Sequence, residues 1–210
     1  GQAGYSPGTR EFFPALIEVL KQRHVAGYID EVQTFGRTTE LFAFQHFGID
    51  EHVDLVTIGK MSQVCATLFT DSYTPRPGLV SQTFTAATSA IHAAMVILHG
   101  LTNDGFFGPG GRIAQLHRYF VDKLQAIADR HHGMIAGPYG AGAMIAFTPL
   151  DGSPDKVKSF CQKLFDHGVI SFVAGANPTR ARFLMPVGVV TENDIDAVCE
   201  IVERTLVEVS

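Results

Sequence analysis

The chain has 210 residues, which is enough for one large domain or two small ones. Its 46% hydrophobic and 18% charged residues are typical of a globular protein and argue against disorder. The net charge of −5, with no basic block among aromatic residues, argues against nucleic acid or anionic membrane as a partner. Three scattered cysteines indicate buried core thiols in a reducing compartment. With no signal peptide and no apolar run near the ~20 residues of a membrane helix, we expect a cytoplasmic protein.

The first half of the chain alternates helices with short apolar strands. Thr9 is suited to cap a helix whose apolar residues recur at helical spacing from Phe12 to Leu20. The elements expected next are a strand (25–30), a polar loop (33–39), a short helix (41–47) and two further strands (53–58 and 64–70). This order is typical of an α/β sheet with parallel neighbours.

The second half begins with a helix over residues 85–101 that is apolar on all sides, so we expect it to be buried. The Gly- and Pro-rich run Gly105–Gly111 is the expected domain boundary. Beyond it we expect a long amphipathic helix (112–131), two strands around a glycine turn (135–148), a helix (156–167), strands at 169–173 and 181–185, and a last helix capped by Thr191. The order predicts part of a large α/β domain over residues 1–104 and a smaller α+β domain over residues 105–210.

Two charged residues stand at the ends of predicted strands. Asp30 closes the first strand and Lys60 directly follows the second. Because ligands collect at the carboxyl ends of strands in an open α/β sheet, both side chains should share one crevice. Pyridoxal 5'-phosphate (PLP) suits both, since it accepts a lysine as an imine and presents a pyridinium nitrogen to a carboxylate. A structural ion pair is the alternative, and spacing alone favours it.

Residues 30–38 form the run Asp30-Glu31-Val32-Gln33-Thr34-Phe35-Gly36-Arg37-Thr38. This run closely resembles the signature of class III aminotransferases, the ω-aminotransferase branch of the fold-type I PLP enzymes. The resemblance continues through residues 41–48 and 54–60, and resumes at Thr83-Phe84 and Arg182-Phe183. It covers the chain in order and implies the PLP-dependent transferase fold. The chain resembles the C-terminal half of such an enzyme, so the family's phosphate-binding loop and its stacking aromatic residue are expected before Gly1.

The resemblance implies a role for each matching residue. Lys60 corresponds to the Schiff-base lysine, which also moves the substrate proton, and Asp30 to the partner of the pyridinium nitrogen. Val32 would contact one face of the ring, and Gln33 would donate a hydrogen bond to its phenolic oxygen. Thr83 matches a threonine that reaches the cofactor phosphate of the neighbouring subunit, which implies a homodimer with a shared active site.

Substrate recognition is implied at the other end of the chain. Arg182 matches an arginine that binds the α-carboxylate of glutamate or 2-oxoglutarate, a task that suits its planar, bidentate fork. Arg180, two residues away, could face the same side of the strand and is the alternative. Gln2 stands where the family commonly has a glutamate that pairs with this arginine, and a glutamine cannot neutralise Arg182.

The sequence therefore predicts a PLP-dependent aminotransferase. It would move an amino group from an amino acid, an ω-amino acid or a diamine to a 2-oxo acid, with 2-oxoglutarate as the expected acceptor. A PLP aminomutase or decarboxylase of the same family is one alternative, and a non-catalytic fragment is another. No metal is expected, because the pair His131-His132 lacks further ligands.

Overall fold

A computed structural model describes residues 2–81 and 83–209 of the chain. It divides into two compact units: residues 8–111 form the N-terminal unit, and residues up to Pro7 join those from Arg112 onward in the C-terminal unit. The division lies at the end of the Gly- and Pro-rich run, after Gly111. The C-terminal unit is thus discontinuous in sequence, because its first segment precedes the whole N-terminal unit.

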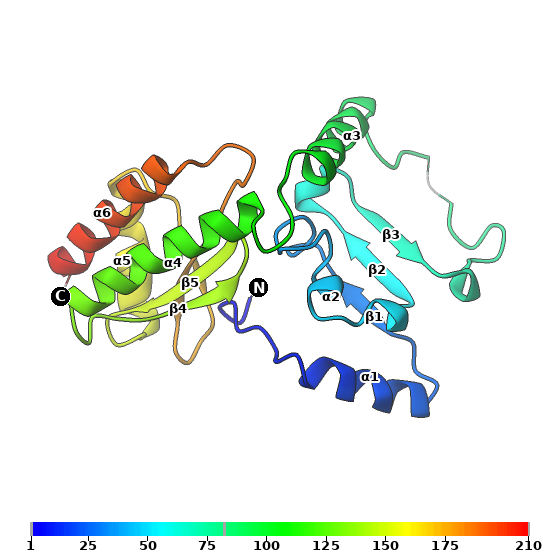
Figure 1. The fold of residues 1–210 in the computed structure, drawn as a ribbon, viewed down its shortest axis with the longest axis horizontal. Coiled ribbons are helices and arrows are strands. Elements are labelled where there is room, and N and C mark those ends of the chain that lie inside the picture. The colour runs from blue at the N-terminus through cyan, green and yellow to red at the C-terminus, as the bar shows by residue number, and fades with distance from the viewer. Residues whose placement is uncertain (1, 82, 210) are drawn as a thin grey trace. The chain divides into compact units, whose positions relative to one another are not determined.

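The N-terminal unit starts with α1 (Phe12–Gln22), where the Thr9 hydroxyl accepts the N–H of Phe12 at 3.2 Å. Its three-stranded sheet has the order β1-β2-β3 (Figure 1). The strands are β1 (Tyr28–Asp30), β2 (Leu55–Ile58) and β3 (Ala66–Phe69). The helices are α2 (Ala43–His46), three 3-10 turns, η1 (Asp50–His52), η2 (Lys60–Ser62) and η3 (Asp71–Tyr73), and α3 (Thr88–Asn103).

The strands of this sheet are not all parallel. β1 and β2 are parallel as predicted, with Asp30 opposite Thr57. β2 and β3 are antiparallel, with Ile58 opposite Ala66, so the prediction of parallel neighbours is wrong for this pair. The connection between them, residues 59–65, is too short for a parallel crossover, which needs about a dozen residues or more.

Helix α3 is less buried than its composition predicts. Only Ala94 and Leu101 are buried, whereas Met95 is 61% and Val96 is 71% exposed among the described residues. Leu98 packs against the core of the unit, so one side of the helix is covered. A helix that is apolar on all sides is fully buried only where other elements cover every side. Among the described residues, only the core of the N-terminal unit covers α3, and it covers one side.

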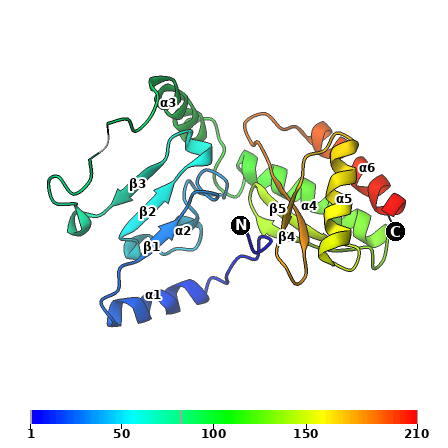
Figure 2. The same ribbon diagram turned by 180° about the vertical axis from the view of Figure 1, so that it is seen from behind.

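The C-terminal unit has a four-stranded antiparallel sheet in the order β4-β5-β7-β6. Its helices lie on one face of that sheet (Figures 1 and 2). On this face Phe183 contacts Phe120 and Phe147 contacts Phe160, with ring centroids 5.5 and 5.9 Å apart. No helix in the described part of the chain is both long enough and apolar enough to cross a membrane. The elements are α4 (Arg112–Arg130), β4 (Ile135–Ala141), β5 (Met144–Pro149), α5 (Pro154–Asp166), β6 (Phe172–Ala174), β7 (Arg180–Leu184) and α6 (Glu192–Val209).

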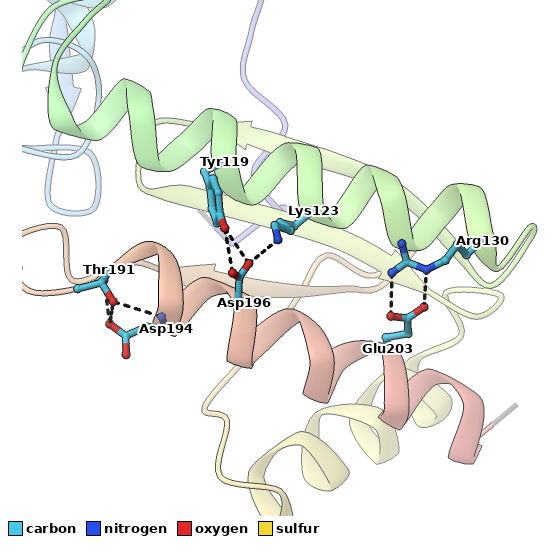
Figure 3. Close-up of polar contacts among 7 residues, drawn as sticks. All are labelled: Tyr119, Lys123, Arg130, Thr191, Asp194, Asp196 and Glu203. Atoms are coloured by element: carbon cyan, nitrogen blue, oxygen red, sulfur yellow. Dashed lines mark hydrogen bonds and ion pairs between the residues drawn. The ribbon is translucent and has the colours of Figure 1, made fainter.

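Two polar clamps join α4 to α6 (Figure 3). In the first, Asp196 accepts a hydrogen bond from the Tyr119 hydroxyl at 2.9 Å and pairs with Lys123 at 2.6 Å, and both donors lower the pKa of its carboxyl. In the second, Arg130 donates two hydrogen bonds of 2.8 Å to Glu203, and these lower the pKa of Glu203 to about 2. Their spacing along both helices fixes the register of α4 against α6.

The predicted cap of α6 and the predicted glycine turn are both present. The Thr191 hydroxyl donates to Asp194 at 2.7 Å and accepts the N–H of Asp194 at 3.3 Å (Figure 3). Gly140, just before the turn from β4 to β5, has a φ of +115°. A Cβ added there would lie 2.0 Å from the carbonyl oxygen of Met144, so only glycine fits.

Candidate active site

Asp30 lies at the carboxyl end of β1, beside the parallel strand β2. Its Oδ1 accepts the N–H of Val32 at 3.0 Å and lies 3.3 Å from the donating hydroxyl of Thr57. Within residues 2–81 and 83–209, its Oδ2 accepts no hydrogen bond. The carboxylate is exposed, so one oxygen fixes its orientation while the other remains available to a ligand.

Lys60 follows β2 at the same edge of the sheet, one residue beyond Gly59. Its φ is +51°, a left-handed conformation that costs a non-glycine residue about 1–2 kcal/mol. Its carbonyl oxygen accepts the N–H and the side-chain amide of Gln63, both at 3.0 Å, and these bonds stabilise the turn. The ammonium is exposed and makes no hydrogen bond or ion pair in the described part of the chain. A strained backbone that presents an unpaired side chain is typical of a functional position.

Val32 and Gly59 bring the two strand ends together. Gly59 is buried, and a Cβ added to it would lie 3.5 Å from a methyl carbon of Val32 and 3.3 Å from the sulfur of Cys65. Gly59, which precedes Lys60, therefore lies beside Val32, which follows Asp30 by two positions. Cys65 is exposed, so the prediction of a core thiol is wrong for this cysteine, while Cys161 and Cys199 are buried as predicted.

Glu31 organises the loop that follows Asp30. It is 0% exposed, and its carboxylate accepts the N–H of Phe44 at 3.0 Å and the hydroxyl of Thr34. Its own N–H donates to the carbonyl of Thr57 at 2.9 Å, so it links β2 to the start of α2. Glu31 belongs to the signature run, but the sequence predicts no separate role for it. No local signal identifies its burial, because the groups that bond it, from Phe44 and Thr57, lie far away in the sequence.

The remaining predicted cofactor residues differ in how the structure places them. Gln33 is half-buried in the loop that Glu31 organises, and its carbonyl accepts a hydrogen bond from the buried Arg37 at 2.9 Å. Thr83 is exposed in the loop before α3 and makes no hydrogen bond to any described residue. The structure thus gathers Asp30, Val32, Gln33 and Lys60 at one edge of the sheet, and it shows no contact that joins Thr83 to them.

The two arginines of β7 have different surroundings within the C-terminal unit. Arg180 donates to the carbonyl of Gly4 at 2.7 Å and to the hydroxyl of Ser6 at 2.9 Å, and its guanidinium lies 3.7 Å from the ring centroid of Tyr139. Arg182 lies with its guanidinium 5.5 Å from the ring centroid of Tyr5. Arg180 therefore holds the N-terminal segment to the sheet by hydrogen bonds, and Arg182 lies beside the Tyr5 ring of the same segment.

Comparison with known proteins identifies the family. Residues 1–206 match the family described as aminotransferase class-III. The chain belongs to the class III aminotransferases. An acetylornithine aminotransferase of Archaeoglobus fulgidus is 29% identical over 208 residues, covering 96% of this chain and 50% of its own length. An ornithine aminotransferase of Saccharomyces cerevisiae is 25% identical over 218 residues, covering 98% of this chain and 50% of its own length. The chain thus spans about half the length of the curated relatives that it matches.

Solved structures of class III enzymes show the same fold. The lysine aminotransferase of M. tuberculosis superposes with a TM-score of 0.88 at 25% identity, covering 100% of this chain and 48% of its own. The predicted fold, that of the PLP-dependent transferases, is therefore confirmed, and PLP is the cofactor of class III aminotransferases. The residues at the edge of the sheet fit this cofactor. Asp30 offers an acceptor for a pyridinium N–H, and Lys60 offers an unpaired amine.

Proposed function

We propose that this chain belongs to a PLP-dependent aminotransferase that moves an amino group from an amino acid, an ω-amino acid or a diamine to a 2-oxo acid, with 2-oxoglutarate as the acceptor. The main observation in support is the pair of strand ends at which Asp30 keeps one oxygen unbonded and Lys60 presents its amine from a strained turn. Family membership supports the reaction type, because the curated relatives named above are ornithine and acetylornithine aminotransferases.

The cofactor would be held by four residues of the N-terminal unit and one of a second subunit. Lys60 would bind it covalently as a Schiff base, and Asp30 would accept the hydrogen bond of its pyridinium nitrogen, a charge-assisted bond about twice as strong as a neutral one. Val32 would cover one face of the ring, and Gln33 would donate to its phenolic oxygen. Thr83 would donate to the phosphate in the neighbouring subunit, so we propose a homodimer.

Each residue has a distinct chemical task. The bound cofactor supplies a ring that withdraws electrons from the carbon bearing the transferred nitrogen. Asp30 keeps the proton on the ring nitrogen, and this positive charge is what makes the ring electron-withdrawing. Lys60 would act as the acid–base group, and its Nζ would take up and give back the proton of the substrate carbon. Its turn, held by Gln63, keeps the amine at the edge of the sheet throughout.

Arg182 would bind the carboxylate of the acceptor, as the family resemblance implies, and Arg180, which donates to Gly4 and Ser6, is the alternative. Gln2 offers no carboxylate to neutralise Arg182. The carbonyl of Gln2 accepts the N–H of Gly175 at 2.8 Å, which fixes its backbone beside β6. We further propose that the protein works in the cytoplasm.

Borohydride reduction in the presence of PLP, followed by peptide mapping, tests the attachment point. We expect the label on Lys60 and its loss in Lys60→Ala, while Lys158→Ala, which removes an exposed lysine of α5, keeps it. The mapping should be run on this chain and on any longer product of the same gene. The absence of label from Lys60 in every form would refute the proposal. Product analysis separates the alternatives, because an aminomutase or a decarboxylase turns over without a 2-oxo acid.

A further inference from the structure

Two aromatic rings lie near the guanidinium of Arg182 on one face of the C-terminal sheet. Phe172 on β6 lies directly opposite Arg182 in the strand register, with its ring centroid 5.9 Å from the guanidinium carbon. Tyr5, from the N-terminal segment, lies 5.5 Å from the same carbon. Tyr5 is 5% exposed and packs against Met144 and Ala146 of β5, so its ring is fixed on this face, away from the helices.

The backbone around Tyr5 is bent so that its ring can reach the sheet. Gly4 and Tyr5 have consecutive positive φ values of +84° and +55°, which is costly for tyrosine. Arg180 donates hydrogen bonds on both sides of Tyr5, to the carbonyl of Gly4 and to the hydroxyl of Ser6. A Cβ added to Gly4 would lie 2.8 Å from Cδ of Arg180, so the segment sits tightly on this side chain. Arg180 thus fixes a strained conformation that places Tyr5 beside Arg182.

We propose that Tyr5 and Phe172 are positioning residues that hold the Arg182 guanidinium for a substrate carboxylate. The proposal rests on the proposed function, in which Arg182 binds the carboxylate of the 2-oxo acid. The two rings set how strongly the site binds a carboxylate, and Arg180 acts through Tyr5.

The physical reason lies in how a ring holds a guanidinium. A cation–π contact attracts the charge to the ring face and requires none of the N–H groups that a carboxylate needs. An arginine side chain has many rotamers, and a ligand that immobilises it loses affinity to that ordering. Two rings and a strained anchor restrict Arg182 before the substrate arrives, so less affinity is lost on binding.

Binding of glutarate, a dicarboxylate that cannot react, tests the proposal on the full chain. We expect Tyr5→Leu or Phe172→Leu to weaken binding roughly 2- to 5-fold each, and the double variant roughly 4- to 25-fold. Tyr5→Phe keeps the ring and should bind within about 2-fold of the unchanged chain. Tyr119→Leu removes a similar ring contact, with Lys123 on α4, and serves as the control. In turnover assays the loss should appear in KM for the 2-oxo acid and not in kcat.

Two further readouts separate the possible failures. Arg182→Gln should abolish glutarate binding. If it does so while Tyr5→Leu and Phe172→Leu bind as tightly as the unchanged chain, the positioning role is wrong and the proposed function stands. If the unchanged chain binds no glutarate, or if Arg182→Gln binds it equally well, the substrate role of Arg182 fails and the positioning role fails with it. The NMR shift of the Arg182 side-chain N–H should move in Tyr5→Leu and not in Tyr5→Phe, and an unmoved shift would also overturn the proposal.

Discussion

Replacing Glu31 by alanine should destabilise the N-terminal unit more than any surface change. The fully buried carboxylate accepts hydrogen bonds from the N–H of Phe44 and from Thr34, and alanine leaves both donors without an acceptor inside the protein. A hydrogen bond to a charged group contributes about 1.5–3 kcal/mol, so losing two predicts a fall of about 3–6 kcal/mol in the free energy of unfolding. Glu31→Gln keeps one oxygen acceptor but adds N–H donors. Its free energy of unfolding should therefore lie between that of the unchanged chain and that of Glu31→Ala.

Urea denaturation followed by hydrogen exchange measures this loss in the right unit. Peptides covering residues 28–58 report the N-terminal unit, and peptides from α4 to α6 report the other. Glu51→Ala is the matched control, because Glu51 is exposed on η1 and makes no side-chain hydrogen bond within the described residues. It should change stability by less than about 0.5 kcal/mol. If Glu31→Ala lowers the stability of the N-terminal unit by less than about 1 kcal/mol, the buried carboxylate does not organise the loop.

Three further predictions concern other parts of the chain. The pKa of Glu203 is about 2 in the folded chain and ~4.3 in the unfolded chain, so its contribution to stability is complete above pH ~4.3 and is lost as the pH falls through about 2. In urea titrations, the stability difference between the unchanged chain and Glu203→Gln should shrink over that pH range. A constant difference would contradict the clamp. A thiol reagent should modify Cys65 in the native chain and the buried Cys199, whose pKa burial raises to about 12, only on unfolding; mass spectrometry would reveal a second native adduct if this is wrong. Gly140→Ala should lower the free energy of unfolding by about 3 kcal/mol or more. Gly188 has open space around it, so Gly188→Ala should lower this free energy by less than about 0.5 kcal/mol. Equal midpoints of thermal unfolding for the two variants would refute the steric argument.

The sequence predicted the elements whose signals are local. The apolar runs that end at Asp30 and Ile58, and the cap formed by Thr191, need only neighbouring residues to be recognised, and all appear in the structure. The antiparallel direction of β3 was also accessible, because a connection from Gly59 to Cys65 cannot cross a sheet. That prediction failed because the order of elements was used and the length of the connection was not.

Other features depend on contacts between distant residues and could not be predicted. The burial of Glu31 follows from Phe44 and Thr57, which reach it only after the sheet has formed. The different contacts of Arg180 and Arg182, two positions apart on one strand, come from a segment at the other end of the chain. Spacing gives both arginines the same face of β7 and does not say which groups of the N-terminal segment each of them contacts.

The discontinuity of the C-terminal unit has a consequence for its synthesis. Gly4 and Arg180 are joined by a hydrogen bond although they are 176 positions apart, and the N-terminal unit lies between them. At a translation rate of roughly 5–20 residues per second, the segment around Tyr5 waits roughly 10–35 s for the strand on which it will dock. If residues 8–111 fold during this interval, they shorten the loop that must close and lower its entropic cost. Strand β7 then completes a sheet face whose first segment was made before residues 8–111.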